Sequence, residues 1–315
     1  MGASAERGRI VVVCGPTATG KTELAIALAR RYGGEMVSAD SMQVYRGLVV
    51  GTAAPTAEEL GGIPCHLTGF VPPEERYSVA EWLKAATGAI RDILARGRLP
   101  VVCGGTGLYI QSLVQGLSYD EAPQPLELRK SLEQQWDEQG GEAVYQRLAG
   151  LDPEHAARLH LNDKKRIIRA LEQSLTGGGT AAARAAQSRR HPPSFEALCL
   201  GLNHPERAEL YARINRRVDK MMERGLLAEA ELVWRHRDSY QTAAQAIGYK
   251  EFFPYFEEQA LLEGCVDKLK QATRNYAKRQ LTWFRRMDMV HWLDAGAEGL
   301  TDAAAELVNP FVHET

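Results

Sequence analysis

The sequence predicts an α/β protein: a P-loop-type parallel sheet core with an inserted helical module and C-terminal helices. Two observations carry this prediction. Short apolar runs alternate with amphipathic helical patterns from residue 10 to residue 103, as in parallel sheets wound through helices. From about Ala122 to Arg286 the pattern is almost wholly helical, interrupted by an apolar run at residues 195–201.

The N-terminal part supplies the first strands and helices of the core. The predicted strands are Ile10–Cys14, Glu35–Ala39 and Leu99–Cys103, and the predicted helices are Lys21–Tyr32 and Ser78–Ala95. Short apolar strands joined by helices favour right-handed crossovers in one parallel sheet. Ligands bind at the carboxyl ends of such strands. Ligand-binding and catalytic residues are therefore expected in the segments that follow each strand.

The middle of the chain predicts a helical insertion. The expected helices are Leu126–Gln139, Gly141–Ala149, Pro153–Leu159 and Asp163–Thr176, with glycine and proline breakers at 176–179 and 191–193. We read the low-complexity segment at 177–187 as a linker or strap. The predicted domains are a catalytic core of residues 8–116 and 195–293, a helical insertion of residues 117–194, and an acidic tail of residues 294–315.

A phosphate-binding loop follows the first strand and opens the first helix. Backbone N–H groups in such a loop point at phosphate oxygens, and the helix N-terminus adds roughly half a positive charge. The lysine adds a cation, and the last threonine hydroxyl can hold Mg²⁺. The sequence therefore predicts a site for a di- or triphosphate, made of Gly15, Pro16, Thr17, Ala18, Thr19, Gly20, Lys21 and Thr22.

Polar clusters also follow the other two strands. Asp40 and its neighbours come after the second strand, and Gly104-Gly105-Thr106 follows the third. Asp40 could bind a metal, cap a helix or act as a general base, and Gln43 offers an amide to a nucleobase edge. The third strand ends without the aspartate that holds Mg²⁺ in many nucleoside-triphosphate hydrolases. This absence favours a pyrophosphate that leaves over a γ-phosphate that is transferred.

The bulk composition is that of an ordinary globular protein, but its charges are segregated. The chain has 315 residues, 44% hydrophobic and 25% charged, with a net charge of −2. Basic residues dominate residues 158–190 and 268–286, whereas the tail from Asp294 carries no Lys or Arg. Such blocks suggest a polyanionic partner or, equally, solvated helix faces. Tyr276, Trp283 and Phe284 in the second block suit stacking on unpaired bases or a helical core stripe.

Other features concern the compartment. The five cysteines are scattered and never spaced as CxxC, which indicates reduced thiols in the cytoplasm and no zinc site. No apolar run approaches the ~20 residues of a membrane span, and Met1–Arg9 lacks the apolar core of a signal peptide. We expect a cytoplasmic protein without a membrane partner.

Taken in order, a set of motifs resembles the tRNA dimethylallyltransferases (tRNA isopentenyltransferases) of the bacterial type. The resemblance runs from about residue 10 to residue 293. The motifs are GPTATGKT at 15–22, ADSMQVY at 39–45, GTA at 51–53, PCHL at 64–67, GGTGLY at 104–109, NDKKRIIRALE at 162–172, AIGYKE at 246–251 and TRNYAKRQ at 273–280. Thr19 stands where the family often has Ser, and Ala54 where it often has Lys. No Cys/His zinc-finger pattern follows Arg286.

The resemblance implies transfer of the dimethylallyl group of dimethylallyl diphosphate to N6 of adenosine 37, beside the tRNA anticodon, with release of diphosphate. It implies a monomer, Mg²⁺ held through Thr22, and an insertion that binds the anticodon stem-loop. Asp40 is then the expected base, Arg217 clamps the diphosphate, and Thr106 contacts the adenosine or positions the diphosphate. The implied tRNA contacts are Asp40, Ser41, Met42, Gln43, Thr106, Arg129, Lys165, Arg166, Ile167, Ile168, Arg169, Gln245, Ala246, Ile247, Gly248, Tyr249 and Lys250.

Three other functions compete with this reading. A cytokinin-type isopentenyltransferase acting on free adenine nucleotides shares the P-loop and Asp40 but needs no helical insertion. A small-molecule P-loop kinase would use Asp40 to activate a hydroxyl and would consume ATP. A non-catalytic nucleotide-dependent RNA-binding protein would leave Asp40 and Thr106 without a role.

Overall fold

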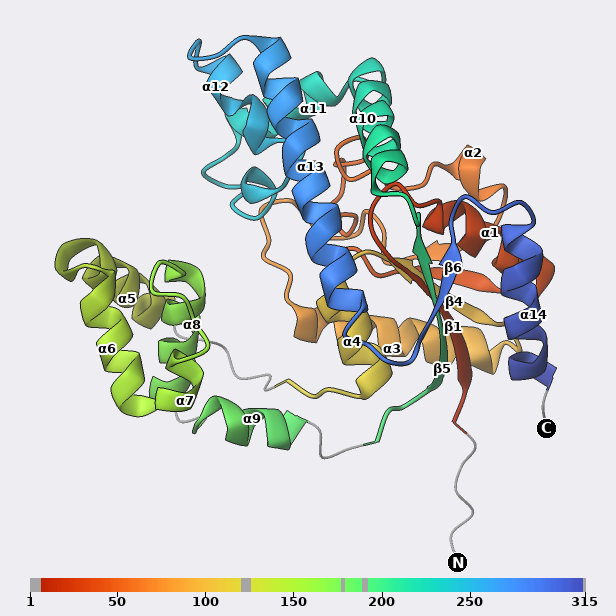
Figure 1. Cartoon of the computed structure of the whole chain (residues 1–315), viewed down its shortest axis with the longest axis horizontal. Helices are drawn as coiled ribbons and strands as arrows, with labels where there is room; N and C mark the ends of the chain where they lie inside the picture. The colour runs from red at the N-terminus through yellow and green to blue at the C-terminus, as the bar shows by residue number, and fades with distance from the viewer. Residues whose placement is uncertain (1–6, 120–125, 177–178, 189–191, 314–315) are drawn as a thin grey trace, which may run out of the picture. The chain divides into compact units, whose positions relative to one another are not determined.

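The computed structural model describes residues 7–119, 126–176, 179–188 and 192–313 (Figure 1). Within these ranges six parallel strands form one sheet in the order β3-β2-β4-β1-β5-β6. This parallel α/β core confirms the predicted fold class. The strands are β1 (Arg9–Cys14), β2 (Glu35–Ser38), β3 (Cys65–His66), β4 (Pro100–Gly104), β5 (Glu196–Asn203) and β6 (Val290–Asp294).

The central strands are buried on both faces, which explains their continuous apolar sequences. In β1, Ile10 and Val12 pack into the core on one side of the sheet, whereas Val11 and Val13 pack on the other. Helices α3 (Val79–Ala95) and α4 (Gly107–Gln115) cover the first face, and α1 (Lys21–Arg31) and α14 (Leu300–His313) cover the second (Figure 1).

Helices that follow β5 reach the carboxyl end of the sheet. The α10 helix (Arg207–Glu223) packs on the 23-residue α13 helix (Leu262–Phe284) through Leu210, Ile214 and Ala277. Functional side chains on both helices are thereby brought to the end of the sheet where β1 runs into the P-loop. The elements of this region are α2 (Ala57–Leu60), α10 (Arg207–Glu223), α11 (Leu226–Arg235), η1 (Ala243–Gln245), η2 (Lys250–Phe252), α12 (Phe253–Phe256) and α13 (Leu262–Phe284).

The chain divides into two compact units, one of Met1–Val114 with Pro193–Thr315 and the other of Gln115–Pro192. The second unit is helical, and Leu132, Leu148 and Leu171 contribute to a core of its own. Its helices are α5 (Leu126–Gln139), α6 (Gly141–Leu151), α7 (Pro153–Ala156), α8 (Lys164–Leu175) and α9 (Ala181–Ser188). The strap read at 177–187 is a helix from Ala181 onward. The breaker residues Gly177, Gly178 and His191 lie outside the described residues, as do Arg189 and Arg190 of the first basic block.

Several elements of the described core have no counterpart in the sequence prediction, among them α2, β3, α4, β6 and α14. The acidic tail forms α14, whose Ala304, Ala305 and Val308 are buried against the sheet. Its acids, such as Asp302 and Glu306, lie on the exposed face. The prediction of an acidic tail, which rested on its charges, therefore missed an amphipathic helix. None of the helices in the described ranges is long and apolar enough to span a membrane.

Candidate functional site

A cavity of about 1040 Å³ lies at the carboxyl end of the sheet, within the α/β unit. Its wall includes the P-loop, the segment after β2 and the end of β4. Nine Lys or Arg side chains line the cavity against three Asp or Glu. Such a surplus of positive charge in a concave site attracts polyphosphate and phosphodiester groups.

The backbone of the P-loop depends on its glycines. A Cβ at Gly15 would lie 2.3 Å from the Leu202 carbonyl oxygen, and the residue has a φ of +135°. No side chain fits there. Gly20, in the left-handed region, begins α1 without a side-chain cap. The buried Thr19 hydroxyl donates to the Pro16 carbonyl at 2.9 Å, so this side chain secures the loop and does not face the cavity.

Lys21 spans the loop from inside. Its Nζ donates to the Pro16 carbonyl oxygen at 2.6 Å. Burial lowers the pKa of Lys21 to about 8, and Arg217 contributes to the same shift. The Lys21 ammonium lies beside the cavity, where the negative charge of a bound diphosphate would favour its protonated form.

For the allylic diphosphate that the sequence resemblance implies as substrate, we expect kcat/KM to fall as pH rises through about 8, by up to about tenfold per pH unit. The folded-state pKa of Lys21 lies below its ordinary value, so free enzyme loses this cation above pH 8 and retains it below. Rates measured from pH 6.5 to 9.5 test this. Lys21→Arg, which stays charged throughout, should remove the inflection. An inflection at the same pH in Lys21→Arg would contradict the assignment.

Asp40 begins the turn that follows β2. Its Oδ1 accepts hydrogen bonds from the Met42 and Gln43 backbone N–H groups at 2.8 and 3.3 Å. Among the described residues, none donates a hydrogen bond to the second oxygen, Oδ2. One oxygen therefore fixes the carboxylate, and the other can accept a proton from a ligand. The Thr106 hydroxyl accepts from the Ser41 N–H at 3.0 Å and joins the turn to the end of β4.

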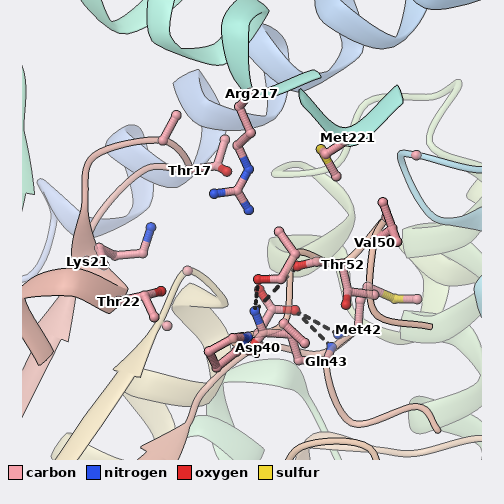
Figure 2. A pocket seen from close by; sticks show the side chains of 18 of the residues that line it. Thr17, Lys21, Thr22, Asp40, Met42, Gln43, Val50, Thr52, Arg217 and Met221 are labelled. Carbon is pink, nitrogen blue, oxygen red and sulfur yellow. Dashed lines mark hydrogen bonds between the residues drawn. The ribbon is translucent and has the colours of Figure 1, made fainter. Parts of the chain in front are cut away.

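Arg217 and Lys21 face Asp40 across the cavity (Figure 2). Arg217 extends from α10 toward the space between the P-loop and Asp40. Burial lowers the pKa of Arg217, and the Asp40 carboxylate opposes that shift. Arg213, one helical turn earlier, donates to the Ala18 carbonyl at 3.2 Å. The α10 helix thus supports the P-loop and also supplies it with a second cation.

Two further residues hold the loops around the cavity. Glu229 on α11 accepts from the N–H groups of Val49, Val50 and Gly51 at 2.7–3.0 Å, and from the buried Tyr249 hydroxyl at 2.9 Å. On α13, Gln280 contacts both the P-loop and Gly105. Neither residue is among those predicted from the sequence.

Most predicted site residues of the α/β unit meet at this one cavity. Gly15, Pro16, Thr19 and Thr106 lie behind its wall and support it. The Gln43 amide is engaged by the protein: it accepts from the Ser38 hydroxyl and donates to the Thr52 and Ala53 carbonyls. The predicted residues that line the cavity are Thr17, Ala18, Gly20, Lys21, Thr22, Asp40, Ser41, Met42, Gln43, Arg217, Gln245, Ala246, Ile247, Gly248, Tyr249 and Lys250.

The predicted contacts on α8 divide by burial. Lys165, Arg166 and Arg169 line a smaller cleft of about 300 Å³ in the helical unit. Ile167 and Ile168 are 0% and 3% exposed and pack in the core of that unit. The prediction that these two isoleucines contact RNA through their side chains is wrong, because the helix turns both side chains into the core.

Two predicted arginine contacts share a buried carboxylate. Arg129 and Arg169 donate to the Glu172 carboxylate at 2.7 and 2.8 Å, and Glu172 is 1% exposed. This pairing neutralises a buried charge within the helical unit. Arg129 and Arg169 therefore have a structural role, whereas Arg166 is far more exposed.

The aromatic residues of α13 have three different environments. Phe284 is fully buried in the core. Tyr276 lines the cavity, and burial raises the pKa of its hydroxyl. Trp283 is 38% exposed and lies against Gly107. Of the three, Trp283 is the most exposed.

The residues present fit a magnesium ion held jointly with a diphosphate. No group of three or more His, Cys, Asp or Glu side chains in the described ranges could hold a metal alone. Mg²⁺ commonly takes one or two protein oxygens and completes its shell with phosphate and water. The Thr22 hydroxyl, on the P-loop side of the cavity, is such an oxygen (Figure 2).

The model of the IPP transferase family matches residues 43–287, well over half of the chain. The chain belongs to this family. A model described as isopentenyl transferase also matches residues 8–65. This membership confirms the resemblance found in the sequence.

Curated relatives extend the likeness over nearly the whole chain. A tRNA dimethylallyltransferase of Geobacillus thermodenitrificans is 45% identical over 91% of this chain and 90% of its own length. That of Geobacillus kaustophilus is 44% identical over 96% of each chain. Both cover the α/β unit and the helical unit together.

Two solved structures of tRNA-modifying transferases share the fold. The tRNA isopentenylpyrophosphate transferase of Bacillus halodurans gives a TM-score of 0.69 at 39% identity, covering 98% of this chain and 96% of its own. A eukaryotic dimethylallyltransferase, described as acting on tRNA, gives a TM-score of 0.81 at 29% identity, covering 97% and 79%.

Proposed function

We propose that this protein transfers the dimethylallyl group of dimethylallyl diphosphate to N6 of adenosine 37, beside the tRNA anticodon, and releases diphosphate. The observation that carries the proposal is the placement of Asp40 opposite Lys21 and Arg217 in one cavity (Figure 2). One wall suits a leaving diphosphate and the other suits the amine that attacks. The named relatives are tRNA-modifying enzymes over the same length of chain.

The chemistry follows from the charges. The C1–O bond of the allylic diphosphate breaks, the N6–C1 bond forms, and Asp40 takes one proton from the exocyclic nitrogen. Negative charge develops on the departing diphosphate, where Lys21, Arg217 and the start of α1 stabilise it. When bound, Mg²⁺ would neutralise further charge on the same group, with Thr22 holding it.

The acceptor must enter the cavity as an extruded base. A stacked adenine cannot bring N6 to Asp40, whereas a base in an unpaired loop leaves its stack at a cost of a few kcal/mol. The exposed basic side chains of α8 and α13 support binding of the RNA backbone. The free thiols of all five cysteines support a reducing, cytoplasmic setting, and we infer that the protein acts as a monomer.

Incubation with labelled dimethylallyl diphosphate tests the proposal directly. We expect label to be transferred to an anticodon stem-loop RNA that carries adenosine 37. An RNA with guanosine at that position should remain unlabelled, and so should AMP. Chelation of Mg²⁺ should lower the rate. Label in AMP but not RNA would favour the nucleotide-specific alternative, and label in neither would overturn both transferase functions. ATP consumption with phosphoryl transfer would instead indicate a kinase.

Substitutions of two nearby arginines on α8 should have different effects, one on RNA binding and the other on stability. Arg166, 74% exposed, is expected to contribute to the RNA grip, so Arg166→Ala should lower the slope of log Kd against log salt by about one. Arg169→Ala should instead lower the melting temperature, because it leaves the buried Glu172 less compensated. Equal salt slopes for wild type and Arg166→Ala would remove Arg166 from the RNA interface.

A further inference from the structure

Gln280 makes two hydrogen bonds to two different loops of the cavity. Its Oε1 accepts from the Thr17 N–H of the P-loop at 2.9 Å, and its Nε2 donates to the Gly105 carbonyl at 2.9 Å. The residue lies on α13 and is only 6% exposed. Both ends of the amide are therefore used, in a buried setting where such bonds are costly to lose.

The surrounding residues are shaped to admit this side chain. A Cβ at Gly105 would lie 2.2 Å from Gln280 Nε2, so an alanine there would displace the amide. The hydroxyl of Tyr276, one turn earlier on α13, lies near the Thr106 and Gln280 side chains. Thr106 in turn accepts from the Ser41 N–H beside Asp40. A continuous set of polar contacts thus joins the P-loop, the Gly105 loop and the Asp40 turn.

We propose that Gln280 is a positioning residue that sets the spacing between the diphosphate-holding P-loop and the Asp40–Thr106 pair. This inference rests on the proposed prenyl transfer. Attack on C1 requires the amine and the leaving oxygen to lie on opposite sides of one carbon. The distance between the two loops therefore decides whether bound substrates can react.

This role differs from substrate binding. Gln280 spends both polar ends on backbone groups, so its loss should change loop spacing more than loop charge. A displacement of about 1 Å in such a site can reduce a rate by about 10²-fold. We expect Gln280→Met, which keeps the length and loses the hydrogen bonds, to lower single-turnover transfer to RNA by about 10–100-fold.

Binding of inorganic pyrophosphate and of the stem-loop RNA distinguishes a positioning role from a general loss of structure, because a loss of structure would weaken both affinities. Both Kd values should stay within about threefold of wild type in Gln280→Met, since the cations and the basic surfaces are unchanged. Gln271→Met, the same substitution at an exposed position of α13, is the matched control and should leave transfer within about twofold. A parallel loss of both affinities in Gln280→Met would overturn the proposal.

A double-mutant cycle gives an independent test. Gly105→Ala removes the same contact from the other side, so it should slow transfer like Gln280→Met, and the two together should be no worse than the slower single variant. Multiplying effects would overturn the inference. Gly105→Ala carries the test alone if Gln280→Met lowers the folded fraction in circular dichroism. Absence of transfer by wild type would overturn the proposed function itself, whereas an active wild type with an equally active Gln280→Met would overturn only this inference.

Discussion

Asp40→Asn is expected to lower turnover by about 10²–10⁴-fold while RNA affinity stays nearly unchanged. Asparagine keeps the Oδ1 atom that accepts from Met42 and Gln43, so the turn after β2 survives. What is lost is the group that takes the proton from the amine in the proposed reaction. Single-turnover transfer of labelled dimethylallyl groups and equilibrium RNA binding are the two measurements.

The substitution chosen for Asp40 decides how the result is read. Asp40→Ala removes the base and also the acceptor that orders the turn, so its effect should exceed that of Asp40→Asn. Glu23→Gln changes another carboxylate of the same cavity wall and should leave turnover within about threefold. RNA affinity falling as far as turnover in Asp40→Asn would make Asp40 a structural residue of the RNA site.

Lys21→Met should lower kcat/KM for the allylic diphosphate by about 10²–10³-fold. The methionine keeps an unbranched side chain within the loop and removes the cation nearest the expected leaving group. Inorganic pyrophosphate should bind more weakly, as calorimetry can measure, and RNA affinity should be preserved. The loss should be greater in rate than in pyrophosphate affinity, because charge on the leaving group is largest in the transition state.

Lys220→Met is the matched control for this change. Lys220 lines the same cavity from α10 but is exposed, so its loss should cost less than about fivefold. Comparable losses in the two variants would mean that the cavity acts through its overall charge. In that case the position of Lys21 inside the loop would have no special importance.

Local sequence was sufficient for the features that depend on neighbouring residues. The strand, glycine loop and helix at residues 9–31 form as predicted, because apolar periodicity and glycine placement are encoded within that segment. Helix α5 has the predicted bounds for the same reason. The carboxyl-end rule for parallel sheets also brought the Asp40 and Thr106 segments to one place.

Features that depend on distant contacts could not be read this way. Gln280 is 263 residues from Thr17, and Glu229 is about 180 from the backbone groups it binds. Each is one polar residue on an amphipathic helix, and its own helix does not reveal the loop it meets. The resemblance motifs contained Gln280 without assigning a role to it. Ile167 and Ile168 show the converse limit, since a motif was carried over whole although its helix buries two of its members.

The strand order has a consequence for how the chain acquires its shape. Strand β1 lies inside the sheet, and Val11 pairs with residues 101 and 198, so its two neighbours emerge roughly 90 and 190 residues later. The helical unit is made of local contacts and has its own core, so it can fold before β5 has been synthesised and can pair with β1. Ribosomal synthesis would thus complete the helical unit before the sheet closes. The loop nearest the N-terminus would be among the last parts to reach its working geometry.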